Sequence, residues 1–355
     1  MTASELLEKI TFIGASDIFI VAGLPISYRI YNQVIQDGDE RLMPGDTAHM
    51  IREFYALADN RDISLLEKNG DDDFSFTLSG VARFRVNAYR QRGSLSAVIR
   101  IINFNIPEPK ELGFSKEDEN CIIELANLKK GFVLVTGPAG SGKSTTLACM
   151  IDHINKTRRS HIITLEDPLE YLHLHKNSIV SQREVTTDTD NYLSALKASL
   201  RQSPDVILLG EMPDRETMNL AITASETGRL ILSSLHTVGA VNTIDRIIDS
   251  FPSMSQQQIA IQLSSVLQAI VSQQLVPTVD GNVVPVFEIM IMTPEIKALL
   301  RDLEIVKIND VIDRSTNPRM VSMDESLLKL YREGVISAET AVEYAIFPEM
   351  MQKKL

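Results

Sequence analysis

The sequence has few cysteines, no long apolar segment and no excess of basic residues. Each of these absences excludes a class of protein. The two cysteines, Cys121 and Cys149, form neither a CxxC motif nor a disulfide framework, so we predict reduced core thiols of a cytosolic protein. No apolar run approaches the ~20 residues that a membrane-spanning helix needs. The first residues mix acids with bases, which does not predict a signal peptide.

The charge balance is acidic, because 35 Lys and Arg face 47 Asp and Glu for a net charge of −12. A protein with a broad nucleic-acid surface would be basic, so we expect no nucleic-acid partner. The 355 residues, 44% of them apolar and 23% charged, have the composition of an ordinary globular protein with room for two domains.

One motif carries the clearest chemistry. The apolar run 132–135 leads into Gly-Pro-Ala-Gly-Ser-Gly-Lys-Ser at 137–144, which is the G-x-x-x-x-G-K-S phosphate loop of nucleoside triphosphatases. A chance glycine-rich turn would not need the preceding strand or the helix expected over 145–156. Its glycines let backbone amides point at an anion, while Lys143 reaches the β- and γ-phosphates and Ser144 ligates Mg²⁺. We predict that ATP and Mg²⁺ bind through Gly137, Pro138, Ala139, Gly140, Ser141, Gly142, Lys143, Ser144 and Thr145.

Three further polar residues lie where strands are expected to end. Glu166 follows the apolar run 161–165, Glu211 follows 205–209, and His236 follows the run that starts at 229. Strand ends of an open α/β sheet form its ligand edge, where carboxylates orient water or reach Mg²⁺ and a histidine can approach a phosphate. We predict Glu211 as a second Mg²⁺ contact, directly or through water. Two alternatives stay open: Glu166 in a solvated acidic turn, and His236 as a structural histidine.

The proline-containing segment 105–110 is the predicted domain boundary, because its two prolines block helix continuation. We predict domain one at 1–106, a linker at 107–117 and domain two at 118–355. The first is expected to be a small α+β domain with an antiparallel sheet. Its predicted helices are 4–13 and 47–58, and its predicted strands are 17–21, 27–31, 74–78, 81–89 and 95–102.

Strands and helices alternate after the boundary, which predicts a mainly parallel sheet with helices on both faces. Beyond about residue 250 the chain is expected to turn helical again. The Gln-rich stretch 255–275 is expected to be a long amphipathic helix, and 324–347 two short helices.

Arg83 and Arg85 lie on one face of a predicted strand, because side chains alternate along a strand. Two neighbouring guanidinium groups need an anion or a carboxylate partner. One interpretation is an exposed face neutralised by the acidic run 71–73. The other is contact with a phosphate, including one bound to a neighbouring subunit, where an arginine in trans is worth roughly 10³–10⁵ in rate.

Four blocks, GPAGSGKSTT, ITLEDPLEY, DVILLGEMPDRET and SSLHTVGAVNTIDRI, resemble in this order the secretion-ATPase superfamily that powers type IV pili and type II secretion. GASDIFI and ARFRVNAYRQRGSLSAVIR resemble its first domain, and SMDESLLKLYREGVISAET extends the resemblance nearly to the C-terminus. The chain is most similar to the pilus-retraction branch. Other branches usually are longer at the N-terminus and carry a four-cysteine zinc insert.

The resemblance implies an α/β fold: a RecA-like P-loop NTPase domain with a smaller N-terminal PAS-like α+β domain, assembled as a homohexamer with nucleotide between the domains. It implies an ATPase whose Glu166 polarises water, with Glu211 as the Walker B glutamate, His236 as the His-box histidine, and Arg83 and Arg85 approaching phosphates. The implied partners are an inner-membrane pilus platform protein and a partner assembly ATPase. The implied location is cytoplasmic, at the inner face of the membrane.

The chain departs from this family pattern at several positions. The retraction branch carries an A-I-R-N-L-I-R-E-like segment; residues 295–302 keep its Ile, Leu and Arg spacing and depart from it at Glu295 and Ala298. Pro213 and Gln268 stand where the family usually has Arg. An assembly or secretion motor, and a nucleotide-sensing regulator of a partner motor, therefore stay as alternatives to a retraction motor.

Overall fold

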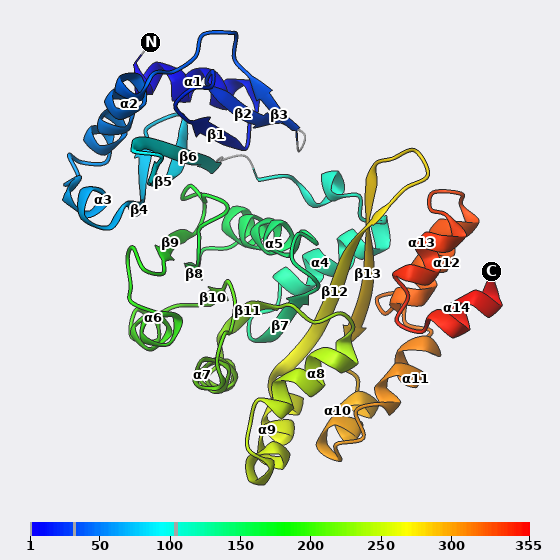
Figure 1. Cartoon of the computed structure of the whole chain (residues 1–355). Helices are drawn as coiled ribbons and strands as arrows, with labels where there is room; N and C mark the ends of the chain where they lie inside the picture. Colours follow the sequence, from blue (N-terminus) through cyan, green and yellow to red (C-terminus); the bar gives the residue numbers. More distant parts are fainter. Residues whose placement is uncertain (1, 31–32, 103–105) are drawn as a thin grey trace. The chain divides into compact units, whose positions relative to one another are not determined.

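A computed structural model describes the chain except for residues 1, 31–32 and 103–105. It contains two compact units, of which the first runs to residue 105 and includes 170–172, and the second contains the rest. Each unit has its own sheet and core (Figure 1). Among the described residues, no helix is both long and apolar enough to cross a bilayer.

The first unit is built on a six-stranded antiparallel sheet with the strand order β3-β2-β1-β6-β5-β4. Its elements are α1 (Ala3–Ile13), β1 (Asp17–Ile20), β2 (Ser27–Ile30), β3 (Gln33–Gln36), α2 (Pro44–Leu57), α3 (Ser64–Asn69), β4 (Asp71–Leu78), β5 (Ala82–Gln91) and β6 (Ser94–Ile102). The predicted helices and strands are present, whereas β3 and α3 were not predicted. Tyr31, the last residue of one predicted strand, lies outside the described residues.

Local sequence explains why these elements form. Helix α1 starts with a capping box, in which Thr2 and Glu5 satisfy each other's backbone amides, and ends at Gly14 in the left-handed conformation. On β4 and β5, Phe76 lies opposite Phe84, and both are buried in the core of this unit. The period-2 pattern of these strands therefore separates a core face from a polar face.

The second unit contains a seven-stranded sheet with the order β13-β12-β7-β11-β10-β8-β9, parallel except for β13. Its elements are η1 (Pro109–Leu112), α4 (Lys116–Ala126), β7 (Gly131–Thr136), α5 (Lys143–Thr157), β8 (His161–Glu166), β9 (Ile179–Glu184), α6 (Tyr192–Ser199), β10 (Val206–Leu209), α7 (Arg215–Glu226), β11 (Leu230–Leu235), α8 (Ala240–Asp249), α9 (Ser253–Val266), β12 (Leu267–Pro277), β13 (Val283–Ile291), α10 (Pro294–Arg301), α11 (Lys307–Asp313), α12 (Met323–Arg332), α13 (Ala338–Glu343) and α14 (Pro348–Lys354).

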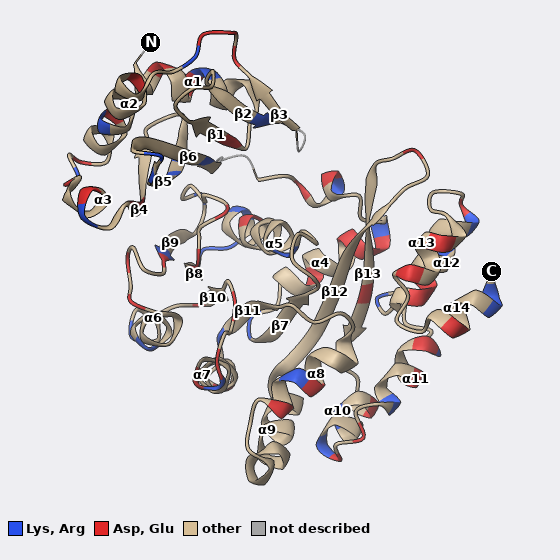
Figure 2. Ribbon diagram, in the orientation of Figure 1, with Lys and Arg blue, Asp and Glu red and all other residues tan. Residues whose placement is uncertain are grey.

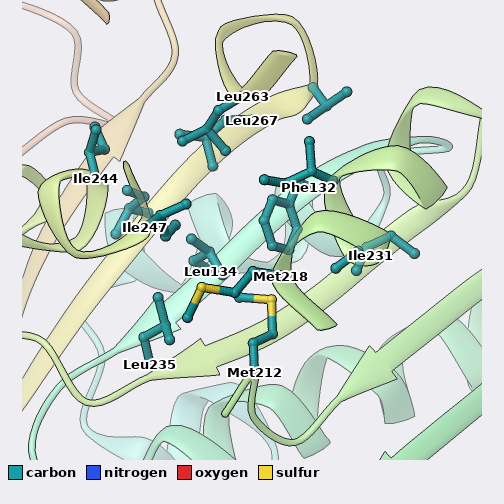
Figure 3. Close-up of a cluster of buried hydrophobic side chains, with 14 of the residues drawn as sticks. Phe132, Leu134, Met212, Met218, Ile231, Leu235, Ile244, Ile247, Leu263 and Leu267 are labelled. Carbon is teal, nitrogen blue, oxygen red and sulfur yellow. The ribbon is translucent and has the colours of Figure 1, made fainter. Parts of the chain in front are cut away.

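Strand β7 is buried along its whole length, as expected for a central parallel strand covered on both faces. Phe132 and Leu134 pack with the helices of one face, and Val133 and Val135 pack on the other. Figure 3 shows the first of these clusters, where Met212 and other apolar side chains surround Phe132 and Leu134. This packing fixes β7, and with it the loop that follows, in the middle of the sheet.

The predicted long helix at 255–275 is wrong. Helix α9 ends at Val266, and β12 begins at Leu267. The segment Ala-Ile-Val at 269–271 is β-branched-rich and fully buried, and it pairs with β7 on one side and with β13 on the other. Pairing in the sheet therefore outweighs the helical composition of this stretch. Strand β13 was not predicted either.

The segment after the first unit is partly ordered rather than a plain connection. The short helix η1 and the start of α4 at Lys116 fall within the predicted linker 107–117. The Cys149 thiol donates a hydrogen bond to the Pro107 carbonyl at 2.8 Å. Cys121 and Cys149 are both free and buried, and burial raises the pKa of each thiol to about 12. Both are therefore neutral thiols of the interior.

Candidate active site

The phosphate loop connects β7 to α5, as the sequence predicts. Gly137, Gly140 and Gly142 all have positive φ, at 144°, 76° and 87°. A Cβ atom on Gly137 would lie 2.0 Å from the Gln273 carbonyl oxygen, so no other residue fits there. Positive φ at glycine is the conformation that lets successive backbone amides of a loop turn toward a bound anion.

Lys143 is the first residue of α5, and its side chain is buried in the mouth of this loop. Its Nζ donates to the carbonyls of Gly137 and Pro138, both at 2.9 Å. The positive end of the α5 dipole and the Lys143 ammonium therefore act on the same small volume. An anion bound there gains from both.

The polar atoms of the loop fit a phosphate group. The Ser141 hydroxyl is buried without a hydrogen-bond partner among the described residues. Pro138, Ala139 and Gly140 form the exposed rim, while Ser144 and Thr145 are half-buried in the first turn of α5. The loop thus offers amide, hydroxyl and ammonium donors to an anion.

Glu211 and His236 follow neighbouring parallel strands, β10 and β11. The His236 Nε2 lies 3.6 Å from Glu211 Oε2, and its Nδ1 lies 3.5 Å from Lys143 Nζ. The His236 side chain is 63% exposed, which argues against a purely structural histidine. The structure therefore brings together Lys143, Glu211 and His236 at one edge of the sheet.

Glu166 ends strand β8 and is half-buried, whereas Asp167 and Glu170 are exposed. Its Oε1 accepts a hydrogen bond from Gln182 Nε2 on β9 at 3.4 Å. A solvated acidic turn therefore does not describe Glu166, whose carboxylate is held by the neighbouring strand.

Tyr192, the first residue of α6, was missed by the sequence reasoning. A Cβ atom on Gly210 would lie 3.0 Å from its hydroxyl oxygen, so Gly210 is the residue that admits the ring here. Burial, together with the negative charges of Glu211, Asp167 and Glu166, raises the pKa of Tyr192. The neutral phenol therefore lies beneath the acidic edge formed by the ends of β8 and β10. No sequence motif marks it.

A sequence model of the family described as "Type II/IV secretion system protein" matches residues 2–323. The chain belongs to this family. It is 41% identical to the type IV pilus retraction ATPase PilT of Pseudomonas aeruginosa, over 98% of this chain and 99% of that protein. It is 40% identical to the pilus ATPase PilU of the same organism, over 97% of this chain and 89% of PilU.

A crystal structure of the pilus retraction motor PilT with bound ADP matches with a TM-score of 0.89 and 42% identity, covering 99% of each chain. The predicted fold class, a RecA-like NTPase domain with a smaller N-terminal α+β domain, is thereby confirmed. The chain is a nucleotide-binding ATPase of the secretion family.

Residues 295–302, which resemble the retraction-branch segment, form most of α10 in this family member. The retained Ile296 is fully buried, the retained Leu299 packs partly buried against the same core, and the retained Arg301 donates through Nε to Ser264 Oγ at 3.1 Å. The departing Glu295 is exposed and pairs with Arg314 at 2.6 Å. The matching residues are therefore core or anchoring residues, and the departures lie outward.

The two other departures have different surroundings. Pro213 is exposed, between buried Met212 and Asp214, the N-cap residue of α7. Gln268 lies at a register shift of β12, where a Cβ on Gly131 would come within 2.4 Å of its Cγ. Gln268 thus has a packing role over Gly131. Nothing in the structure explains a specific role for Pro213.

Arg83 and Arg85 lie on β5 of the first unit, half-buried and on the same face. Arg85 forms an ion pair with Asp73, with Nη2 and Oδ2 at 2.6 Å. The carboxylate partner expected by the first interpretation is thus present for Arg85. Contact of these arginines with a phosphate stays a prediction.

Proposed function

We propose that this chain is a motor ATPase that retracts type IV pili, with ATP hydrolysis driving the removal of pilin subunits. The observation that carries the proposal is the match to PilT over nearly the full length of both chains, in sequence and in structure. A match confined to the phosphate loop would support only nucleotide binding, whereas this one includes the first unit.

We assign the site residues the following roles. The loop amides and Lys143 bind the β- and γ-phosphates, and the Lys143 ammonium attracts them as a point positive charge. Glu166 orients the attacking water, and its bond to Gln182 holds the carboxylate in place. His236 contacts the γ-phosphate and, through its 3.6 Å approach to Glu211, links that contact to the second carboxylate.

Mg²⁺ fits the oxygen ligands of this site. Among the described residues, no group of three or more His, Cys, Asp and Glu could hold a metal ion by itself. Mg²⁺ in phosphate-loop enzymes is instead held by a hydroxyl, waters and substrate phosphates. We propose that Ser144 supplies the hydroxyl and Glu211 a carboxylate, directly or through water. The ion would neutralise charge that develops on the phosphates.

We further propose a homohexamer in which Arg83 and Arg85 complete a nucleotide site. An arginine from a neighbouring subunit supplies positive charge to the nucleotide site only when the subunits close. Hydrolysis can therefore be coupled to that closing movement. The motor would act on an inner-membrane pilus platform protein, from the cytoplasmic face of that membrane. Acidic and basic residues interleave over both units (Figure 2).

Imaging of pili in cells that lack the gene tests the proposal. Loss of a retraction motor should give excess pili that do not retract, restored by the wild-type gene but not by Lys143→Ala. Bald or secretion-deficient cells would instead identify an assembly or secretion motor. Normal retraction in the deletion strain would reject the proposal.

The departure from the family pattern at Pro213 keeps a second candidate: a nucleotide-sensing subunit that regulates a partner assembly or retraction motor. Steady-state ATP hydrolysis by the purified protein separates the two. A nucleotide-sensing regulator would bind ATP with negligible turnover, whereas a motor would hydrolyse it.

A further inference from the structure

Three consecutive polar residues of β12, Ser272, Gln273 and Gln274, are almost fully buried, with 0%, 3% and 7% of their surface exposed. They belong to the segment that composition predicted as helix. Buried polar side chains are costly unless they are hydrogen-bonded, so their partners show what holds this strand in place.

The Gln273 side chain forms hydrogen bonds with the phosphate loop and with α5. Its Nε2 donates to the carbonyl of Ser141, inside the loop, and its Oε1 accepts from Thr146 Oγ1 on α5 at 2.8 Å. A Cβ atom on Gly142 would lie 2.8 Å from its Nε2, so the glycine makes room for this amide. One side chain thus connects the loop to the helix that follows it.

The neighbouring side chains point to the opposite face, as strand alternation requires. Ser272 Oγ accepts a hydrogen bond from the Gly239 amide at 2.8 Å, three residues after His236. Gln274 Nε2 donates to the Tyr344 carbonyl at 3.0 Å, just after α13. Glu288, opposite Ser272 on β13, accepts from the amides of Ala240 and Met323, which begin α8 and α12.

We propose that Ser272, Gln273 and Gln274 form a coupling element, in which Gln273 positions the phosphate loop and its neighbours pass nucleotide occupancy to the His236 segment and the C-terminal helices. The inference rests on the proposed function only in requiring nucleotide at the phosphate loop. Figure 1 shows β12 and β13 as a long strand pair between β7 and α12–α14.

The physical argument is that a buried hydrogen bond resists separation of its partners. If the loop tightens around phosphates, Gln273 either moves with it or loses a buried hydrogen-bond partner. Losing the partner costs more free energy, so Gln273 is expected to move with the loop. Ser272 pairs with both β7 and β13, whereas Gln273 and Gln274 pair with β13 alone. A shift at Gln273 is therefore carried along the strand to residues 272 and 274. Their partners lie in the 237–239 turn and near Tyr344.

The first test compares ATP kinetics of Gln273→Met and Gln274→Met. Methionine keeps the length of the side chain but removes the donor and the acceptor. Gln273→Met should raise KM for ATP roughly 25-fold, because two hydrogen bonds at about fivefold each are lost, with kcat within about twofold. Gln274→Met should leave KM unchanged. A wild-type KM for Gln273→Met would overturn the positioning role.

Should Gln273→Met not fold, Thr146→Val and Thr146→Ser test the same bond from the other side. Valine removes the hydroxyl that donates to Gln273 and serine keeps it. Only Thr146→Val should raise KM. Equal values for the two variants, or no increase with valine, would overturn the positioning role.

The second test measures hydrogen exchange with and without ADP and Mg²⁺. ADP should slow exchange in residues 338–347 of the wild type, and Gln274→Met should lose this effect while binding ADP normally. Persistence of the effect in Gln274→Met, or its absence in the wild type, would overturn the coupling. Both tests use purified protein, so normal pili in a deletion strain would reject retraction while leaving this inference standing.

Discussion

The imidazole of His236 lies between Lys143 and Glu211, with Nε2 3.6 Å from Glu211 Oε2. Its Nδ1 is 3.5 Å from Lys143 Nζ, so the contacts favour the tautomer that carries its proton on Nε2. The side chains of His236 and Glu211 are 63% and 42% exposed, which makes their pairing weak as a source of stability. The arrangement of Lys143, His236 and Glu211 is therefore important for the chemistry of a bound phosphate rather than for the stability of the fold.

His236→Ala should lower kcat roughly 10²-fold, the cost of removing one donor that stabilises transition-state charge. The dissociation constant for ADP should change little, because His236 is assigned to the γ-phosphate. The melting temperature should also stay constant, since the ring is largely exposed. Steady-state hydrolysis, ADP titration and thermal melting check these expectations. A wild-type kcat would remove His236 from the reaction.

Lys143→Ala should lose tight nucleotide binding, because it removes the ammonium at the mouth of the loop. Two charge-assisted contacts at about 1.5 kcal/mol each correspond to roughly 10²-fold in the dissociation constant. Titration with ADP measures this loss. Lys130→Ala serves as a matched control, because this exposed lysine precedes β7 at the end of the strand away from the loop, and it should bind ADP as the wild type does.

Glu211→Ala should bind nucleotide but not turn it over. Its carboxylate lies beside His236 rather than inside the loop, so the phosphate donors stay intact. Single-turnover hydrolysis alongside ADP titration separates the two effects. Unchanged hydrolysis would show that the carboxylate at the end of β10 has no part in the chemistry.

Arg83→Ala should lower the hydrolysis rate without unfolding the first unit, because Arg83 lies on the polar face of β5 rather than among the core residues. If the arginine acts in trans, mixing Arg83→Ala with Glu211→Ala subunits should restore part of the activity. In such a ring, a site with intact Glu211 can receive Arg83 from its neighbour. A mixture no more active than its components would contradict action in trans.

The phosphate loop and its flanking elements could be predicted because their signals are local. An apolar run, a glycine pattern and a helical composition follow one another within residues 132–156. Glu211 and His236 were also found, since parallel strands end at a common edge. Strand β12 could not be predicted, because its Gln-rich sequence becomes a strand only by pairing with β7 and β13.

Two site residues were missed for a related reason. Gln273 reaches Thr146 across 127 positions of the sequence, and Tyr192 acquires its place only through Gly210 and the strand ends around it. Neither belongs to a short motif. Contacts of this kind form only in the assembled sheet, so they cannot be predicted from the spacing of residues in the sequence.

His173 is the buried titratable group with the clearest consequence for pH. It is 8% exposed, and its Nδ1 has no hydrogen-bond partner among the described residues. Burial lowers the pKa of His173 to about 4, with Asp152 opposing the shift and Lys176 adding to it. Its backbone amide donates to Gln182, the residue that holds Glu166, so its environment adjoins the site.

Because the unfolded chain takes up a proton near pH 6.5 and the native His173 does not until about pH 4, stability should fall as pH drops between these values. The contribution is at most about 1.4 kcal/mol per pH unit. His173→Gln should flatten this part of the profile, measured by urea unfolding from neutral pH downward, whereas His49→Gln, at an exposed position, should leave it unchanged. Equal pH slopes for His173→Gln and the wild type would mean that protonation of His173 does not destabilise the native state.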